Sequence, residues 1–433
     1  MLWMRTALGA LICTGAIRFW ARGWVEELLV NRGIRLTYYG FGWVPHPGEL
    51  GCQLLLLVTA LAGASMCIGW GGRWCIALAF VSFTWLELVE ASTYLNHYYF
   101  VSALLLLLCF LPRLPRVDRA WAGAREPDDE VPCGALWAVR VQVAAVYVYA
   151  GIAKLNSDWL LEAEPLRTWL MVRSELPLVG PLLGREATAH AFSFFGAVYD
   201  LTIVGWLSWR KSRPYAWFAV VVFHVMTAML FRIGLFPWIM IALSTVFFEP
   251  DWPRRLLGRL RRWLGGPASA PVRDATAGSA SWSNWRFGVV LALLTSQLLL
   301  PLRQWMYPGN RLWHEQGFRF SWNVMLMEKV GHMEFRVRDA AGERAYTTDA
   351  EMLLTPLQRK MASTQPDLLL QVAHEVGRRA RARGIIAPQV YADVWVALNG
   401  RRRQRFVDPS VDLMQVKDGF GPRTWLAPMS AGP

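Results

Sequence analysis

Long apolar stretches separated by short polar segments fill the first two thirds of this chain. Most of them approach the roughly 20 residues that a helix needs to cross the hydrocarbon core of a bilayer. Nine stretches predict nine spans, at about 4–20, 51–70, 74–90, 93–112, 134–154, 190–208, 214–231, 235–249 and 286–302. The pattern therefore predicts an α-helical polytopic membrane protein with about nine transmembrane helices.

The pattern changes after residue 302, where the long apolar stretches end. Short elements of mixed type follow: a strand at 330–339, a helix with a basic face at 368–383, and strands at 390–398 and 401–407. Asn399-Gly400 lies between the last two, and this dipeptide is favoured in two-residue hairpin turns. We therefore predict a transmembrane helical domain over 1–302 and a small α+β domain over 303–433.

The distribution of charge predicts how the chain is oriented across the membrane. The chain has 45 Lys and Arg against 32 Asp and Glu, a net charge of +13. Basic residues gather in three loops that the nine-span topology places on one side, at 113–125, 210–213 and 254–273. Basic loops stay in the cytoplasm, so we expect the C-terminal domain to be extracytoplasmic. Loop 21–50 is a partial exception, and the Gly-, Ala-, Ser- and Pro-rich segment 264–284 predicts a flexible linker.

Composition excludes several classes of protein. Only 18% of the residues are charged and 24 are Trp, which is unlike a soluble protein of this length. Basic proteins often bind nucleic acid, but most Lys and Arg here lie between apolar blocks or in the C-terminal third. We therefore expect membrane lipid, and no nucleic acid, as a partner. The six Cys fit no zinc-binding spacing, and we expect no metal site.

Among the titratable residues that interrupt the apolar stretches, five are singled out as candidates: His97, Arg140, Lys154, Asp200 and His224. Polar groups within a bilayer are costly, so each is a candidate functional residue. Simpler explanations remain open for each one taken alone. Lys154 could snorkel to the interface, His97 could belong to an aromatic belt, and His224 could be a hydrogen-bonded core residue. Arg140 suggests a structural role, and Asp200 either pairs with it or caps a polar network.

The predicted topology brings three of these residues to one region. His97 and Lys154 lie at the outer ends of their spans, and His224 lies at mid-depth or above. Burial of an amine in an apolar pocket disfavours its charged form. A neutral lysine can accept a proton from an acidic hydroxyl such as that of a hydroquinone, and nearby histidines can hydrogen-bond the developing oxyanion. A lipid-soluble quinol could reach such a site from the bilayer.

Several blocks of the sequence resemble the vitamin K-dependent γ-glutamyl carboxylases and their bacterial homologues, within the horizontally transferred transmembrane domain family. The segment 149–159, YAGIAKLNSDW, is similar to the lysine segment of that family, with Ala153 in place of its first lysine. Further similar blocks are Asn96-His97, Phe223-His224-Val225-Met226, the segment 230–236, the segment 320–325, and the C-terminal segments 388–395 and 405–412. The resemblance covers nearly the whole chain in order.

The resemblance implies a reaction and roles for particular residues. Lys154 would deprotonate vitamin K hydroquinone (or menaquinol), and O₂ would convert the hydroquinone to the 2,3-epoxide. The strong base formed would drive carboxylation of peptide Glu to γ-carboxyglutamate with CO₂. His97 would assist epoxidation, and Trp322 would lie near the Glu substrate. The residues expected to line the quinol pocket are Asn96, His224, Met226 and Met325. A Glu-containing peptide or protein and a quinone reductase that supplies hydroquinone would be the partners.

The chain also departs from the family pattern. Met327 stands where the animal enzymes have a His, and His332 is out of register. The chain ends soon after 405–412, so either substrate recognition differs or peptide carboxylation is absent. Three hypotheses follow: a Glu carboxylase, which we favour; a vitamin K hydroquinone epoxidase or oxygenase without Glu carboxylation; and a non-catalytic quinone-binding membrane module. The Arg- and Ala-rich composition suggests the bacterial inner membrane; a eukaryotic homologue would lie in the endoplasmic reticulum.

Overall fold

A computed structural model of the chain describes residues 2–31, 33–112, 132–231, 233–264, 283–339, 341 and 345–430. The basic loop predicted at 113–125 and most of the linker predicted at 264–284 lie outside the described residues.

Each of the nine predicted apolar stretches corresponds to a helix. These helices are α1 Leu2–Ala21, α2 Gly48–Ile68, α3 Gly72–Val89, α4 Asn96–Phe110, α6 Cys133–Ala153, α10 Glu186–Ser208, α11 Arg213–Leu230, α12 Phe236–Ser244 and α14 Asn284–Leu299. Within the described residues, six are long and apolar enough to cross a membrane: α2, α3, α6, α10, α11, and α14 with its continuation to Trp305. Two more, Asn96–Phe110 and Phe236–Phe247, are apolar but shorter. The chain is a multi-pass membrane protein, and the count of nine spans stays a prediction.

The helices differ in how far they are enclosed by their neighbours. In α6, 61% of the most apolar window is buried inside the protein, against 11% in Asn284–Trp305. Helix α6 is therefore central and ends at Lys154, whereas α14 is peripheral. Helices α1 and α2 approach closely at two glycines, since a Cβ on Gly9 would lie 2.5 Å from the Gly63 carbonyl oxygen. Small residues at such crossings allow backbones to pack tightly in membrane helices.

The C-terminal region contains an antiparallel four-stranded sheet of order β2-β1-β3-β4. The strands are β1 Lys329–Arg338, β2 Ala345–Thr348, β3 Gln389–Leu398 and β4 Gln404–Arg405. Helices α16 Pro356–Ala362 and α17 Pro366–Ala382 accompany the sheet. Alternate residues of β1, such as Phe335 and Val337, are fully buried in a core that Leu369 of α17 shares. The predicted strand at 330–339, helix at 368–383 and α+β class are confirmed.

The predicted hairpin at Asn399-Gly400 is confirmed in its turn and wrong in its second strand. Both residues have positive φ, +48° and +75°, and the Arg401 amide donates to the Leu398 carbonyl oxygen at 3.1 Å. We expected a strand at 401–407, but β4 comprises only Gln404–Arg405. The first residues of that stretch are held away from the sheet because the Arg401 guanidinium binds Asp158.

Short helical elements connect the larger ones. They are Val25–Val30, Ala91–Thr93, α7 Ser157–Leu160, α8 Leu166–Met171, α9 Gly180–Leu183, Thr245–Phe247, α13 Trp252–Trp263, Leu300–Trp305, α15 Arg311–His314, Glu351–Leu353 and Leu413–Gln415. Helix α13 contains the Arg-rich sequence WPRRLLGRLRRW.

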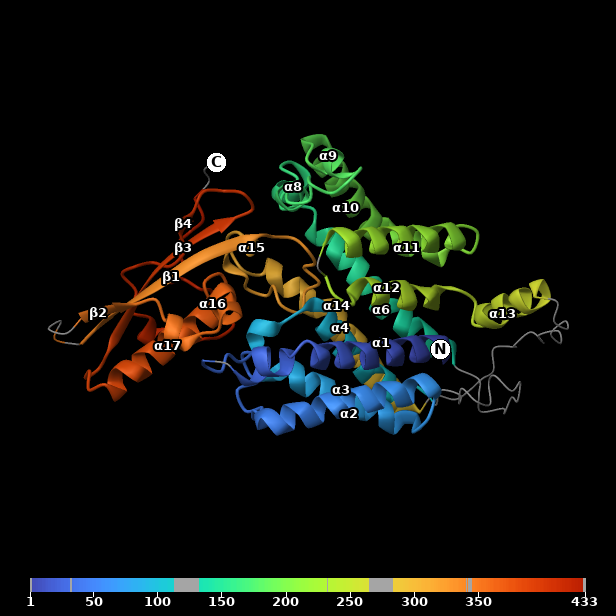
Figure 1. Cartoon of the computed structure of the whole chain (residues 1–433), viewed down its shortest axis with the longest axis horizontal. Coiled ribbons are helices and arrows are strands. Elements are labelled where there is room, and N and C mark those ends of the chain that lie inside the picture. The colour runs from blue at the N-terminus through green and yellow to red at the C-terminus, as the bar shows by residue number, and fades with distance from the viewer. Residues whose placement is uncertain are drawn as a thin grey trace.

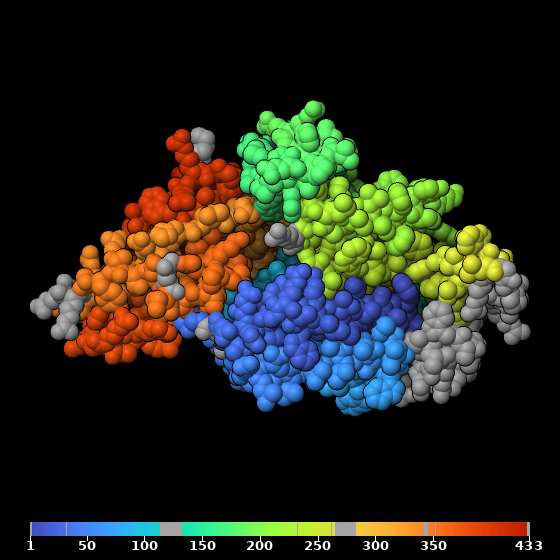
Figure 2. Space-filling view, viewed as in Figure 1, coloured from blue at the N-terminus to red at the C-terminus, as the bar shows by residue number. Residues whose placement is uncertain are grey.

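The sheet lies at one end of the helical bundle, and the N-terminus and basic helix α13 lie at the other end (Figure 1). In the space-filling view, the C-terminal region packs directly against the N-terminal helices and the segment around α8 (Figure 2). Specific bonds hold this contact: the Thr37 amide donates to Gln371 Oε1 at 2.8 Å, and Trp169 Nε1 donates to Glu328 Oε2 at 2.8 Å. The basic helix α13 is thus remote from the sheet, and the orientation across the membrane stays a prediction.

Candidate functional site

Lys154 caps the C-terminal end of α6 and is 5% exposed. Its Nζ donates to Asp200 Oδ2 at 2.7 Å and to the Ala150 carbonyl oxygen at 3.3 Å, and lies 5.2 Å from the centre of the Trp159 ring. A lysine that snorkels would point its amine out to water. Lys154 instead points inward to a buried carboxylate, and the snorkelling explanation does not describe its position.

Asp200 is on α10 and is also 5% exposed. The sequence suggested that Asp200 pairs with Arg140 or caps a polar network. The pairing with Arg140 is wrong, because the structure pairs Asp200 with Lys154. Arg140 binds the short 3₁₀ helix Thr245–Phe247 that follows α12, where its Nε donates to the Val246 carbonyl oxygen at 3.0 Å. Its Nη2 donates to the Phe247 carbonyl oxygen at 3.3 Å. Arg140 therefore satisfies helix-end carbonyls, as its expected structural role requires.

His224 is buried on α11 and shares a hydrogen bond of 2.9 Å with the Tyr147 hydroxyl. Tyr147 lies two turns before Lys154 on α6, so the two side chains share one face of that helix. The Tyr147 ring also contacts Tyr199, the neighbour of Asp200, with ring centres 6.0 Å apart. Lys154, Asp200, Tyr147 and His224 therefore form one buried polar cluster, which we call the lysine centre.

A separate cavity of about 550 Å³ lies between α1, α3, α4 and α12. Its apolar walls include Leu11, Ile12, Phe83, Val101 and Ile239, and Met325 closes part of it from the extramembrane side. Ligand pockets of about 300–1,000 Å³ with mostly apolar walls and a few polar groups are typical of small-molecule sites. We call this space the His97 cavity, after the polar residue that α4 contributes to it.

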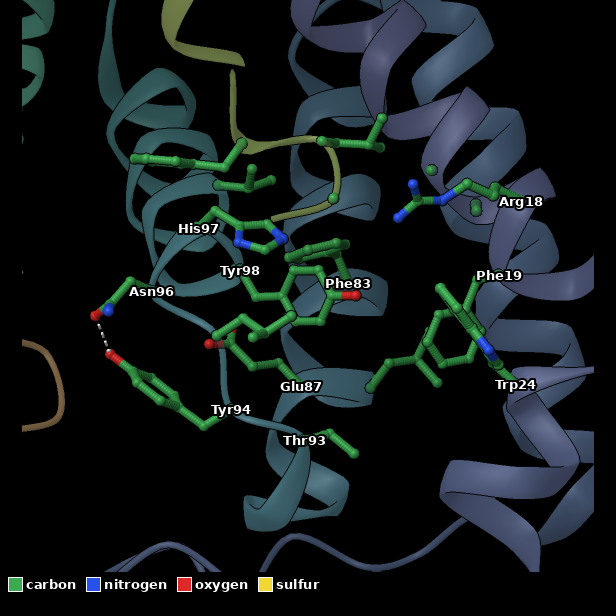
Figure 3. Close-up of a pocket in the computed structure, with 18 of the residues that line it drawn as sticks. Arg18, Phe19, Trp24, Phe83, Glu87, Thr93, Tyr94, Asn96, His97 and Tyr98 are labelled. Atoms are coloured by element: carbon green, nitrogen blue, oxygen red, sulfur yellow. Dashed lines mark hydrogen bonds between the residues drawn. The ribbon is translucent and has the colours of Figure 1, made fainter. Parts of the chain in front are cut away.

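His97 and Asn96 begin α4, and both line the His97 cavity (Figure 3). Asn96 is fixed by two bonds: its Oδ1 accepts from the Tyr94 hydroxyl at 3.0 Å, and its Nδ2 donates to the Asn323 carbonyl oxygen at 2.9 Å. Gly234 has φ +64°, and a Cβ there would lie 3.7 Å from His97 Nε2 and 3.4 Å from Arg18 Nη2. The polar ends of His97 and Arg18 therefore flank the same glycine.

Phe236 lies between the His97 cavity and the lysine centre. Its ring centre lies 6.0 Å from that of His97 and 6.1 Å from that of His224. One aromatic side chain thus separates the His97 cavity from the lysine centre. Of the residues expected around a quinol, Asn96, His97 and Met325 line the cavity, whereas Lys154 and His224 belong to the lysine centre.

Two further expected residues lie in packed cores. Met226 is partly buried against a large hydrophobic cluster that runs from the end of α6 and Trp159 into the C-terminal region. Trp322 is 0% exposed and packs on Tyr99 and Phe100 at ring-centre distances of 5.0 and 5.8 Å. Among the described residues its Nε1 has no hydrogen-bond partner. Trp322 and Met325 both have positive φ, +56° and +54°, a strained conformation that tends to mark functional segments.

Three cavity or cluster residues were not predicted from the sequence, although two of them carried a signal there. Arg18 and Glu87 are charged residues inside predicted spans, and both line the His97 cavity. Glu87 is 8% exposed, and its Oε2 accepts from the Ser102 hydroxyl at 2.7 Å. The rule that charge within a span suggests function applies to both. Tyr147 gave no comparable signal, since a Tyr within an apolar helix is common.

Comparison with protein families covers almost the whole chain. The model described as HTTM domain matches residues 1–252, more than half of the 433 residues, and includes the lysine centre. The model described as vitamin K-dependent gamma-carboxylase, lumenal domain, matches residues 282–432 and includes Trp322 and Met325. No solved structure matches the chain. The protein is therefore a member of the HTTM-domain family and, within it, of the vitamin K-dependent gamma-carboxylase group.

Proposed function

We propose that this protein is a vitamin K-dependent γ-glutamyl carboxylase in which Lys154 is the base that deprotonates the hydroquinone. The buried pairing of Lys154 with Asp200 is the observation that supports this most directly. It lies in the same polar cluster as His224, which Phe236 separates from the apolar cavity. The family membership supplies the class of reaction. The protein lies in the bacterial inner membrane with its C-terminal region on the extracytoplasmic side, in keeping with the basic end of the bundle being remote from the sheet.

The His97 cavity fits a flat, apolar quinol with a polar edge. Its walls are mostly aliphatic and aromatic, and its polar groups are concentrated near the start of α4, where Asn96 and His97 lie. When bound, vitamin K hydroquinone (or menaquinol) supplies the electrons that reduce O₂ and, in forming the 2,3-epoxide, the strong base for the γ-hydrogen of Glu. His97 and Asn96 orient the hydroxyl edge by hydrogen bonds, and Met325 closes the cavity from above.

Lys154 must be neutral before it can accept a proton, and its contact with Asp200 bears on how this happens. The pair can hold its proton on Nζ or on Oδ2. In an apolar interior the neutral arrangement avoids burying two charges, which is costly. The reaction requires the arrangement with the proton on Oδ2, because only then is the amine of Lys154 free to accept the hydroquinone proton. Lys154 does not line the His97 cavity, so the transfer also requires that Phe236 move aside. His224 and Tyr147 hold the adjoining faces of α11 and α6 together through their hydrogen bond.

A second candidate, a hydroquinone epoxidase without Glu carboxylation, is favoured by one observation. The residues expected to contact the Glu substrate lie in packed hydrophobic surroundings, whereas the expected base has a buried carboxylate partner. Trp322 is enclosed in a packed core, and Met327 packs against the hydrophobic core of the C-terminal region. His332 cannot replace the missing histidine locally, because its side chain is 60% exposed on the outer face of β1 and pairs with Glu334.

One assay separates the two functions. The full chain in nanodiscs would receive vitamin K hydroquinone, O₂, labelled bicarbonate and a Glu-containing peptide. A carboxylase forms epoxide and labelled peptide together, and an epoxidase forms epoxide alone. Lys154→Ala should remove both products, whereas Lys211→Ala, at an exposed position between α10 and α11, should remove neither. Epoxide formation by Lys154→Ala at the wild-type rate would exclude Lys154 as the base, and no epoxide from wild type would favour a non-catalytic quinone-binding module.

A further inference from the structure

The segment that follows Lys154 is held from two sides by the extramembrane region. The carbonyl oxygen of Ala153, directly before Lys154, accepts from Arg311 Nη2 of α15 at 2.7 Å. Four residues after Lys154, Asp158 accepts two bonds from Arg401, both at 2.7 Å, and a third from Asn399 Nδ2 at 2.8 Å. Donors that lie about 160 and 240 positions away in the chain thus hold both ends of a six-residue segment.

The Asp158 contacts are those of a fully satisfied buried carboxylate. Asp158 is 4% exposed. Burial raises the pKa of Asp158, but the bonds from Arg401 and Asn399 outweigh it and hold the pKa below its usual range. A bidentate Arg–carboxylate pair fixes direction as well as distance. Removing one partner of such a pair is strongly unfavourable, because the other charge stays buried without compensation.

The hairpin turn of the sheet is shaped to make this contact. The Asn399 Oδ1 accepts from the Glu328 backbone amide at 2.9 Å, and the Asn399 backbone amide donates to the Glu328 carbonyl oxygen at 2.9 Å. Gly400 comes close to Glu164, since a Cβ on Gly400 would lie 3.1 Å from Glu164 Oε1. The turn is therefore tied to the sheet on one side and seated on the segment after Lys154 on the other.

Movement of Asp158 would be transmitted to Lys154 through Trp159. The two residues are neighbours in α7, whose first turn Asn156 caps by accepting from the Trp159 amide at 3.0 Å. The Trp159 ring lies beside the Lys154 amine, and its Nε1 donates to the Ser193 carbonyl oxygen at 2.8 Å. Ser193 is on α10, two turns before Asp200. Trp159 thus contacts Lys154 directly and the helix of its partner Asp200.

We propose that Asp158 and Arg401, with Asn399 and Arg311, form a latch through which the extramembrane region positions Lys154 against Asp200. Arg401 and Asp158 are positioning residues: they act on the reaction through Lys154 and Trp159, without touching the His97 cavity. The effect of the latch on turnover rests on the proposed function. The effect of the latch on the position of the Lys154 side chain does not rest on the proposed function, and it can be measured without turnover.

The test measures the reactivity of the Lys154 amine in the full chain in nanodiscs. Reductive methylation with formaldehyde and a borane, followed by peptide mass spectrometry, gives a rate for each lysine. Exposed Lys211 reports reagent delivery, and buried Lys329, which is held by Glu315, reports general loosening. The variants are Asp158→Asn, Arg401→Ala and the milder Arg401→Lys. The matched control is Arg402→Ala, at an exposed position of the same loop.

We expect Asp158→Asn and Arg401→Ala to raise the labelling rate of Lys154 about tenfold, a typical size for coupling through a packed network. Arg401→Lys, which keeps the cation, should give a smaller rise, and Arg402→Ala none. In the epoxide assay the same variants should lower kcat and leave KM for the hydroquinone unchanged, because the cavity is untouched.

Unchanged labelling of Lys154 in both Asp158→Asn and Arg401→Ala would overturn the latch. So would an equal rise at Lys154 and Lys329, because that would be general loosening rather than positioning. If wild type formed no epoxide but the labelling changed as expected, the latch would stand and the proposed function would fail. If wild type formed epoxide and neither labelling nor kcat changed in the variants, the function would stand and the latch would fail.

Discussion

The lysine centre and the His97 cavity lie one aromatic ring apart and are built in opposite ways. In the lysine centre, Lys154 and Asp200 are each 5% exposed and bonded to each other. The His97 cavity is hollow, and it leaves the polar ends of His97 and Arg18 on either side of a glycine that adds no side chain. The lysine centre can hold and transfer a proton, and the His97 cavity can hold a ligand. The difference suggests that base and binding site are separable, and that Phe236 is the wall between them.

The largest expected effect comes from removing the base and keeping the cavity. Lys154→Ala should lower the rate of epoxide formation at least about a thousandfold, within the range that positioned general bases contribute. It should leave the affinity for vitamin K hydroquinone unchanged, since Lys154 does not line the cavity. Turnover and equilibrium binding in nanodiscs check the two halves separately. If Lys154→Ala weakened hydroquinone binding by as large a factor as it lowered turnover, the lysine centre and the cavity would be one site.

Breaking the ion pair from the other side should destabilise the protein. Asp200→Asn leaves a buried ammonium group without its counter-charge, which costs about 3–5 kcal/mol for buried pairs. Replacing both residues by apolar ones, as in Lys154→Met with Asp200→Leu, should restore most of this loss. Free energies of unfolding in mixed micelles give the comparison. If Asp200→Asn were as stable as wild type, the pair would not carry a buried charge.

Filling the cavity should affect binding and leave the lysine centre alone. Val101 is buried on α4, one turn after His97, and lines the cavity. Val101→Phe should raise KM for the hydroquinone about tenfold, as overpacking of about 1–3 kcal/mol would. It should change kcat little. The matched control is Val81→Phe on α3, where the side chain is 51% exposed. A fall in kcat with unchanged KM would place the ligand elsewhere.

A smaller, pH-dependent effect belongs to the extramembrane region. Burial, with the nearby charges of Arg423 and Lys329, lowers the pKa of His314 from 6.5 to about 4. Its Nδ1 accepts from the Gln316 amide at 3.0 Å, which protonation would prevent. Between pH 6.5 and about 4 the unfolded chain holds more protons at this residue, so stability falls as pH is lowered through that window. The loss at pH 4 should be about 1–2 kcal/mol, after discounting for partial exposure.

The variant His314→Gln keeps an acceptor for the Gln316 amide and removes the titration. Its melting temperature should fall less than that of wild type between pH 7 and pH 5. Equal slopes would mean that His314 does not contribute to the acid sensitivity. The variant also shows where a loss of activity at low pH originates. A loss that His314→Gln abolishes comes from the extramembrane region and not from the lysine centre.

The sequence allowed the helices and the polar residues within them to be located for a simple reason. A bilayer requires long apolar stretches, and a charge within one stands out, so the nine stretches and Lys154, His97 and His224 were all visible. The same rule applied to Arg18 and Glu87, which were passed over. For Asp200 the sequence suggested Arg140 or a polar network, and the pairing with Lys154 was not predicted, because helix packing decides which residue of α6 faces α10.

The sheet shows the same limit. Alternation along β1 and the Asn399-Gly400 turn were readable, because both depend on neighbours in the sequence. The shortness of the second strand, β4, could not be predicted from the sequence, because Arg401 binds the carboxylate of Asp158, 243 positions away in the chain.

The amino-acid sequence by itself determined that the chain enters a membrane, where its helices lie, and which polar residues interrupt them, because hydrophobic length and isolated charge are local properties. Only the tertiary structure decided that Lys154 faces Asp200 rather than water, that His97 faces a cavity, and that Arg401 closes over Asp158. These contacts join residues far apart in the chain. Their existence depends on how helices pack and how a sheet docks, which no stretch of neighbouring residues specifies.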